Sequence, residues 1–502
     1  MTISGISNSN ISPLIQSALD INKQLDDLQR QLGSGQKADS YAGLGSQGGV
    51  AVALNAQLSA LGSFDNTITN VGTTISLQQL VLQQIAKVGG TAQSAAIQPV
   101  YAIDGTGQTT QQKTAQDQLN QMLGLLNTQG ANGYLFSGSG LNQPSVDTAD
   151  HILNGNGSQA GLKQVIAERQ QADLGSDGLG RLVIPALSGT TVVVHEDVAG
   201  SPFGLKLAGV NSTLAGATVS GPTGALDAVS VTLGASNPNN GDTISYTFTL
   251  PDGSSQTLKL TATTSATPGA NQFSIGATPA LTAANLQAAL SAGITQIGAT
   301  SLSAASAVAA SNDFFDDPPQ RVSGSPATAT SLVNGTAANT VFWYTGADGA
   351  GSVRSTQTAR IDPTTTVSYG TQANEQGIRQ VVQGIATLAA TTYSASDPNA
   401  SASYTALNQR VYQALGAPPG VQNITDIEAS LASAQTTMSA AQSQHQQTSN
   451  TLTDMLQSIT GVDQNQVGAE ILSLQTSLSA SLTVTARMAQ LNLLTYLAPV
   501  TG

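Results

Sequence analysis

The chain has 502 residues, of which 40% are hydrophobic, only 9% are charged and 4% are aromatic. This length exceeds what one ordinary core accommodates, so several domains are expected. The net charge of −13 leaves no basic surface to replace phosphate counterions, which argues against a nucleic-acid partner and against docking on an anionic membrane. Because cysteine is absent, disulfides, thiolate catalysis and thiolate metal sites are excluded.

The first residues predict neither a cleaved leader nor a membrane anchor. The start, MTISGISNSNISPLIQ, has no basic segment and no apolar segment of the Sec type. No apolar run in the sequence approaches the length of a membrane-spanning helix. On these grounds alone we would expect a cytoplasmic protein.

Helical periodicity begins close to the N-terminus. Apolar residues from Leu14 to Leu32 advance by alternate steps of four and three, which is the spacing of a heptad seam. This helix is expected to end near Gly33. A second helix is predicted from about Val50 to Val88, ended by Gly89-Gly90, and a third over 111–126.

The C-terminal part of the chain has the same period. Seam residues from Ile424 to Ile459 advance by steps of three and four without a break, which predicts a helix of roughly 50 Å. A final helix is predicted from about Gln464 and continues into the leucine-rich end of the chain. These seams cannot be buried by their own helices, so the terminal helices are expected to pair with each other, with copies of themselves, or with both.

The middle of the chain, roughly 141–369, alternates with the period of β-strands. Apolar residues alternate over 244–250 and again over 258–260, with the turn Pro251-Asp252-Gly253 between them, so a β-hairpin is predicted. Further strands are predicted at 190–196 and 229–233. One short helix is predicted from Ala283 to Ala292, ended by Gly293.

The expected fold class is α+β: a coiled-coil helical rod formed by the N- and C-terminal segments, with a β-rich inserted domain. We predict five regions along the chain. These are an N-terminal assembly helix (1–45) that pairs with a C-terminal assembly helix (460–502), a core helical domain made of 46–140 and 370–459, and the β-rich variable insert (141–369).

The candidate functional residues are apolar seam positions of the two outer helices. We expect them to be buried against partner subunits, because a chain end is otherwise usually polar and frayed. The predicted subunit-assembly residues are Leu14, Ile21, Leu25, Leu28, Leu32, Val467, Ile471, Leu474, Leu478, Leu482, Met488, Leu491, Leu494 and Leu497.

This layout resembles the bacterial flagellin superfamily, and particular stretches carry the resemblance. LDDLQRQLGSGQKA (25–38) is similar to the end of the family's first helix, and 63–95 to its long second helix. ANGYLFSGS (131–139) resembles the segment that closes the first core domain. The end ARMAQLNLLTYL and the stretch 367–390 are nearest to hook-filament junction members, the flagellar hook-associated protein of the third type.

The resemblance implies a structural subunit of the flagellum that supports motility, polymerises through its terminal helices and leaves the cell through the flagellar type III export channel without a cleaved signal peptide. The implied location is the extracellular flagellum. The implied partners are copies of the chain, other axial proteins such as hook-associated protein and flagellin, and an export chaperone. The resemblance also implies that the outer helices become ordered on assembly.

The sequence departs from the family pattern at two places. Most members carry an Asp-Asp pair just after the Ser-Gly turn, where this chain reads SYAGLGSQGG. Members that are bound by the innate immune receptor have an arginine on the second helix, and here Lys87 stands in that region. We therefore expect neither the contacts of that acidic pair nor recognition by the receptor.

An alternative function is a flagellin-like surface protein whose β-rich insert binds carbohydrate or a host surface. Trp343 and Tyr344 are the aromatic pair that could stack on a sugar, although burial in a strand is the interpretation that we favour. Glycan binding would distinguish this function from a purely structural role.

No enzyme, cofactor or metal site is predicted. GLGSQG (43–48) follows a helix rather than a strand, so we interpret it as a flexible helix connection and not as a dinucleotide-binding loop. NDFFDDPPQ (312–320) could be a calcium loop, but it lacks the EF-hand spacing, and a surface loop with an apolar anchor is favoured. His445 lies on the heptad seam and is expected to be a packed or interfacial polar residue rather than a ligand.

Overall fold

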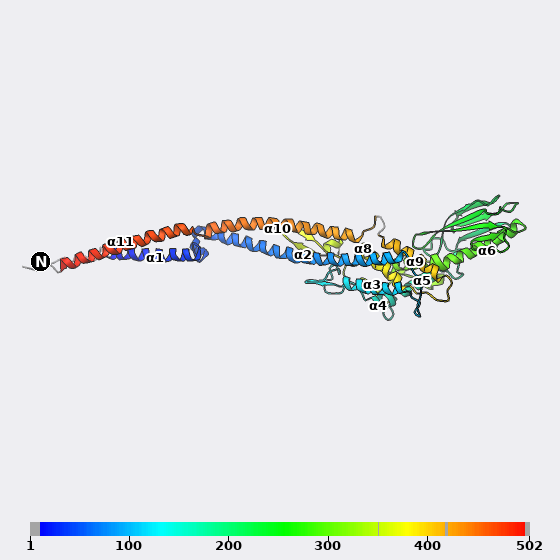
Figure 1. The fold of residues 1–502 in the computed structure, drawn as a ribbon, viewed down its shortest axis with the longest axis horizontal. Coiled ribbons are helices and arrows are strands. Elements are labelled where there is room, and N and C mark those ends of the chain that lie inside the picture. Colours follow the sequence, from blue (N-terminus) through cyan, green and yellow to red (C-terminus); the bar gives the residue numbers. More distant parts are fainter. Residues whose placement is uncertain (1–10, 350, 417–419, 497–502) are drawn as a thin grey trace, which may run out of the picture. The chain divides into compact units, whose positions relative to one another are not determined.

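The computed structural model describes residues 11–349, 351–416 and 420–496. The chain folds as two compact units: unit 1 contains residues up to 70 together with 360–366 and 436 onward, and unit 2 contains 71–359 and 367–435. Long helices come from both ends of the chain and a β-rich region comes from its middle (Figure 1), so the predicted α+β class is confirmed.

Unit 1 is built from helical segments of both ends of the chain. The first predicted helix ends as expected, because Gly35 adopts a φ of 71° and its N–H donates to the carbonyl of Gln31 at 2.8 Å. The stretch GLGSQG lies mainly in a short 3-10 helix. The elements are α1 (Ile11–Ser34), η2 (Tyr41–Gln47), the first part of α2 (Gly48–Ala96), the last part of α10 (Ile424–Thr460) and α11 (Gln464–Tyr496).

Unit 2 contains the remainder of α2 and α10 and a group of shorter helices. These are α3 (Thr110–Leu126), α4 (Ala149–Asn154), α5 (Leu162–Leu174), α6 (Pro279–Ile297), α7 (Ser303–Phe314), α8 (Gln376–Ala390) and α9 (Ala400–Leu415), with the short π-helix η3 (Gly298–Leu302) and the 3-10 helices η4 (Pro326–Thr328) and η5 (Val353–Thr356). Helix α3 packs against α8, and α9 packs against both α7 and α8.

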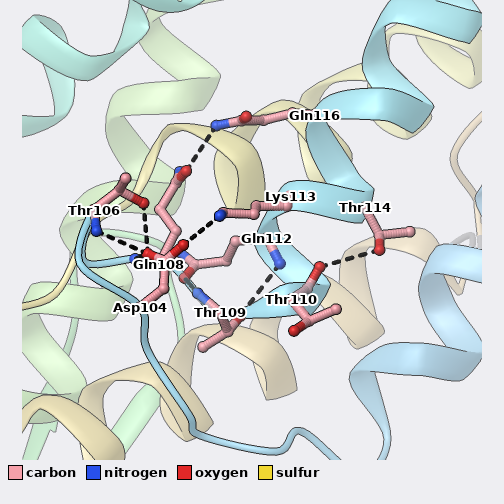
Figure 2. A network of polar contacts seen from close by, with 9 residues as sticks. All are labelled: Asp104, Thr106, Gln108, Thr109, Thr110, Gln112, Lys113, Thr114 and Gln116. Carbon is pink, nitrogen blue, oxygen red and sulfur yellow. Dashed lines mark hydrogen bonds and ion pairs between the residues drawn. The ribbon is translucent and has the colours of Figure 1, made fainter.

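Helix α3 begins with a capping box, shown in Figure 2. The Thr109 hydroxyl accepts the N–H of Gln112 at 3.2 Å, and the Gln112 side chain accepts the N–H of Thr109 at 2.9 Å. Gln112 also donates to the carbonyl of Thr391 at 2.7 Å, which ties this helix start to the end of α8. In the preceding loop, a hydrogen bond from Lys113 lowers the pKa of the Asp104 carboxyl.

Two four-stranded sheets form the β-rich region, in the orders β3-β4-β7-β6 and β10-β9-β8-β5. Helix α6 packs against β4, β9 and β10, and one apolar core joins both sheets to it. The strands of the described chain are β1 (Gln129–Gly130), β2 (Gly133–Tyr134), β3 (Leu182–Val183), β4 (Thr191–Glu196), β5 (Lys206–Ser212), β6 (Thr218–Thr223), β7 (Ala228–Thr232), β8 (Thr243–Thr249), β9 (Ser255–Thr263), β10 (Gln272–Ser274), β11 (Gln320–Val322), β12 (Leu332–Asn334), β13 (Thr358–Arg360) and β14 (Thr366–Ser368).

The hairpin predicted around Pro251-Asp252-Gly253 is confirmed as β8–β9, with Thr249 opposite Ser255. Gly253 supplies the positive φ of 80° that the turn requires. This turn also contacts a helix far away in the sequence. Arg410 on α9 donates from Nε to Asp252 Oδ2 at 2.6 Å, and both side chains are largely buried. The β8–β9 hairpin is therefore attached to the helical part of unit 2.

Two glycines that were expected to end helices lie inside them instead. Helix α2 continues past Gly89 to Ala96, and α6 continues past Gly293 to Ile297. A Cβ atom at Gly89 would lie 2.7 Å from Val381 Cγ1 of α8, and one at Gly293 would lie 2.7 Å from Leu258 Cδ1 of β9. Each glycine lets a neighbouring side chain pack closely against the helix backbone. This packing explains why glycine, a poor helix former, stands inside each helix.

The neighbouring glycines of α2 provide a matched test of this interpretation. We expect Gly89→Ala to lower the free energy of unfolding by about 1–3 kcal/mol, because the added methyl group overpacks the contact with α8. A Cβ added at Gly90 would meet no atom within 4 Å, so Gly90→Ala should raise stability by about 0.5–1 kcal/mol through helix propensity. Urea denaturation of both variants measures the two changes, and a similar effect of both substitutions would contradict the packing role.

The surface loop expected at 312–320 begins later than predicted, at residue 315, whereas its expected apolar anchor is present. Asn312 to Phe314 form the end of α7, and both Phe314 and Phe315 are fully buried. The Phe315 ring lies edge-on to Trp343, with centroids 5.1 Å apart. The middle of the chain thus carries helices, including α4, α5 and α7, that its strand-like alternation did not predict.

Candidate assembly surface on the terminal helices

The turn after α1 and the turn before α11 pair with each other through the backbone. Gln36 and Gly461 form an antiparallel β-bridge. The N–H of Lys37 donates to the carbonyl of Thr460 at 2.8 Å, and the N–H of Val462 donates to the carbonyl of Gly35 at 3.1 Å. This bridge places the end of α1 and the start of α11 at one point, and α1 packs along α11 from there (Figure 1).

Half of the predicted assembly residues form the seam between α1 and α11. Leu25, Val467 and Ile471 are buried at its centre, and further apolar side chains pack around them only partly buried. The predicted residues in this seam are Ile21, Leu25, Leu28, Val467, Ile471, Leu474 and Leu478, and the structure adds Val462. The seam is narrow, so it leaves much of the apolar surface of both helices uncovered.

Other predicted assembly residues lie outside the seam. Leu32, Leu482 and Met488 have exposed side chains. The side chains of Leu14, Leu491 and Leu494 and the whole of Leu497 lie outside the described part of the structure.

Further exposed apolar side chains lie on the same helices outside the predicted seam. Ile15 and Leu19 are exposed on α1, and Leu472 and Val484 are exposed on α11. Ile15 and Leu19 each follow a seam residue by one position, so they form a second stripe beside the seam. A search for apolar residues four apart outside the seam would have found them. We call the exposed set Ile15, Leu19, Leu32, Leu472, Leu482, Val484 and Met488 the outer apolar face. The set covers more than one side of its helices, because residues two apart, such as Leu482 and Val484, point to different sides.

Charged side chains accompany this face, and α1 carries five of them in its 24 residues: Asp20, Lys23, Asp26, Asp27 and Arg30. Arg30 contacts Asp39 at 2.8 Å and Asp27 at 3.5 Å, and the hydrogen bond to Asp39 raises the pKa of the Arg30 guanidinium. A groove of about 420 Å³ runs between the two helices and is lined by residues such as Leu28, Leu474 and the acidic Asp27.

The chemistry of these side chains favours contact rather than catalysis. Leucine, isoleucine, valine and methionine carry no group that transfers protons or attacks a substrate. Among the residues that the structure describes, no group of three or more His, Asp or Glu side chains is placed to hold a metal ion. No helix in the same described part is both long enough and apolar enough to cross a membrane.

Residues 6–140 match the family model described as the bacterial flagellin N-terminal helical region. The matched segment includes α1, α2 and α3, and α1 supplies one side of the α1–α11 seam. No curated protein matches the chain. Flagellins are extracellular structural proteins that self-assemble into polymers, so the match supports the flagellin superfamily and a structural subunit of the flagellum.

The aromatic pair considered for sugar binding is not arranged for stacking. Trp343 is buried, and its indole Nε1–H donates to the carbonyl of Phe315 at 3.2 Å. Tyr344 is half-buried, and burial raises its pKa. A sugar ring could reach the Trp343 face only if the surrounding core opened.

Proposed function

We propose that this chain is a structural subunit of the bacterial flagellum that polymerises by burying the outer apolar face of α1 and α11 against neighbouring subunits. The observation that carries the proposal is the exposure of Leu19 on α1 and of Leu472 and Leu482 on α11. Helix α1 lies in the segment that matches the flagellin family model. Each of these leucines is 55–65% exposed, so its burial on association contributes about 1–2 kcal/mol. Several such side chains per subunit together offset the cost of association.

We further propose that the subunit occupies the hook-filament junction rather than the body of the filament. The support is the resemblance of the chain end, ARMAQLNLLTYL, and of the stretch 367–390 to junction members. Contacts between different faces of identical subunits give an open helical array, and a junction subunit would occupy only a short layer of it. Its partners would then be hook-associated protein on one side and flagellin on the other.

The proposed location outside the cell requires export of the chain, for which the type III flagellar channel and an export chaperone are the proposed route. The absence of cysteine is compatible with this route, because no disulfide can form and block threading of an unfolded chain. Deletion of the gene should abolish flagellum-dependent motility, and expression of the full chain should restore it.

Electron microscopy of the purified full-length protein tests the position in the flagellum. A junction subunit should assemble alone only into short oligomers and not into long filaments, and it should add to isolated hook ends and allow flagellin to polymerise there. Long filaments of the chain alone would refute the junction and favour the filament. Failure to bind itself, hooks and filament ends at any concentration would refute the structural function altogether.

A further inference from the structure

His445 lies buried between two carboxylates in unit 1. Its side chain, on α10, is 2% exposed and its ring lies 6.1 Å from that of Phe64 on α2. Nδ1 lies 2.8 Å from Asp65 Oδ1 on α2, and Nε2 lies 3.4 Å from Asp362 Oδ2 in the loop 361–365 between β13 and β14. The two ring nitrogens therefore face acidic groups on two different elements.

Few other charges are near this imidazole. Asp65 is the only charged residue of α2 in unit 1, and the nearest charge on α10 is Asp454, about 13 Å further along the helix at 1.5 Å per residue. In the loop, the Arg360 guanidinium donates to the backbone carbonyl of Asp362. The backbone N–H of Thr364 donates to the Asp362 carboxyl at 3.1 Å and lowers its pKa, so this carboxylate stays ionised at neutral pH.

The protonation state of the imidazole decides how many of these contacts are favourable. A neutral histidine has one N–H, whereas the imidazolium ion has two. With neutral His445, an N–H at Nδ1 satisfies the shorter contact to Asp65, and the lone pair of Nε2 then faces the ionised Asp362. Only the imidazolium donates a hydrogen bond to both carboxylates.

We propose that protonation of His445 fastens the loop 361–365 onto α2 and α10, and that loss of this proton releases the loop. The contact to Asp362 is the longer of the two and is the one that becomes repulsive, so the loop is released while α2 and α10 stay paired. Histidine is in general the side chain whose charge changes between about pH 5 and 8, which sets the range of pH over which the proposal is tested.

Hydrogen exchange of the full-length protein in dilute solution tests this proposal. The reporters are the amides of Ile361, which donates to Thr365 O at 3.0 Å, and Thr365, which donates to Asp362 O at 3.3 Å. After correction for intrinsic exchange, we expect protection about tenfold higher at about pH 5.5 than at about pH 8, the factor that one charge-assisted hydrogen bond supplies. Equal protection at both pH values would overturn the proposal.

Three variants separate the proposed role from a general effect on folding. His445→Gln should remove the pH dependence. The matched control His151→Gln, which removes an imidazole 2.9 Å from Asp147 in unit 2, should keep it. Asp362→Asn should keep the loop protected at about pH 8, because the amide can donate to the neutral Nε2. Persistence of the pH dependence in His445→Gln would refute the proposed control of the loop by His445. Loss of protection of the loop at about pH 8 in Asp362→Asn, as in the wild type, would refute it too.

Discussion

Replacing Leu472 and Leu482 together by glutamine is expected to abolish polymerisation and to leave the isolated chain folded. These side chains are 65% and 55% exposed, respectively, so the substitutions should change the free energy of unfolding by no more than about 0.5 kcal/mol. Because only about 60% of each side chain remains to be buried, the loss of two leucines removes about 2–4 kcal/mol per subunit from an assembly that buries them. The critical concentration should then rise by about twentyfold to several hundredfold, because 1.4 kcal/mol is a factor of ten.

Sedimentation of the variant across a concentration series, with circular dichroism of the supernatant, measures assembly and folding separately. A matched control replaces Leu281 and Val333, which are 54% and 50% exposed on unit 2, by glutamine. The control should polymerise like the wild type. Normal polymerisation of the Leu472/Leu482 variant, or equal loss in the control, would show that the outer apolar face is not the assembly surface.

Arg169→Leu is expected to destabilise unit 2 by about 3–5 kcal/mol, because it leaves two buried carboxylates without their cation. Arg169 on α5 donates from Nε to Asp173 at 3.0 Å and from Nη1 to Asp313 of α7 at 2.5 Å. The guanidinium carbon also lies 5.1 Å from the centre of the Phe203 ring. Arg379→Leu is the matched control, since its exposed ion pair is worth at most about 1 kcal/mol.

The loss of stability in Arg169→Leu should also depend on pH, and the pKa values of the two carboxyls determine in which direction. Burial raises the pKa of Asp173, and it raises the pKa of Asp313 to about 6. Arg169 lowers both of these pKa values, so its removal raises them further, and the extra cost of ionising the two carboxyls appears in the variant as pH rises above about 4. The difference in unfolding free energy between wild type and variant should therefore be larger at about pH 8 than at about pH 4.5. An equal difference at both pH values would exclude buried negative charge as the cause.

Features that depend on local periodicity could be predicted from the sequence. The heptad steps around Leu25 and Ile427 indicated α1 and α10, and the turn at Asp252 indicated the β8–β9 hairpin. These signals are local, because a helix or hairpin repeats its own pattern within a few residues.

Features that depend on distant contacts could not be predicted. The pairing of Arg169 with Asp173 is readable as a spacing of four on a helix, but its second partner, Asp313, is 144 residues away. In the same way, Gly89 is distinguished from a helix-ending glycine only by the side chain of Val381 on α8. The outer apolar face was missed in part because the heptad pattern favoured one seam and disregarded the stripe beside it.

The contact between Arg410 and Asp252 has a consequence for engineering this chain. The β-rich segment shares buried polar contacts and packed surface with α8 and α9, so it is not an interchangeable cassette. Excising 141–369, or producing it alone, would strand the Arg410 guanidinium or the Asp252 carboxylate in an apolar surrounding. Display of a foreign peptide should instead use the tips of the β-strands distant from α9, such as the turn between β6 and β7, where a Cβ added at Gly224 would meet no atom within 4 Å.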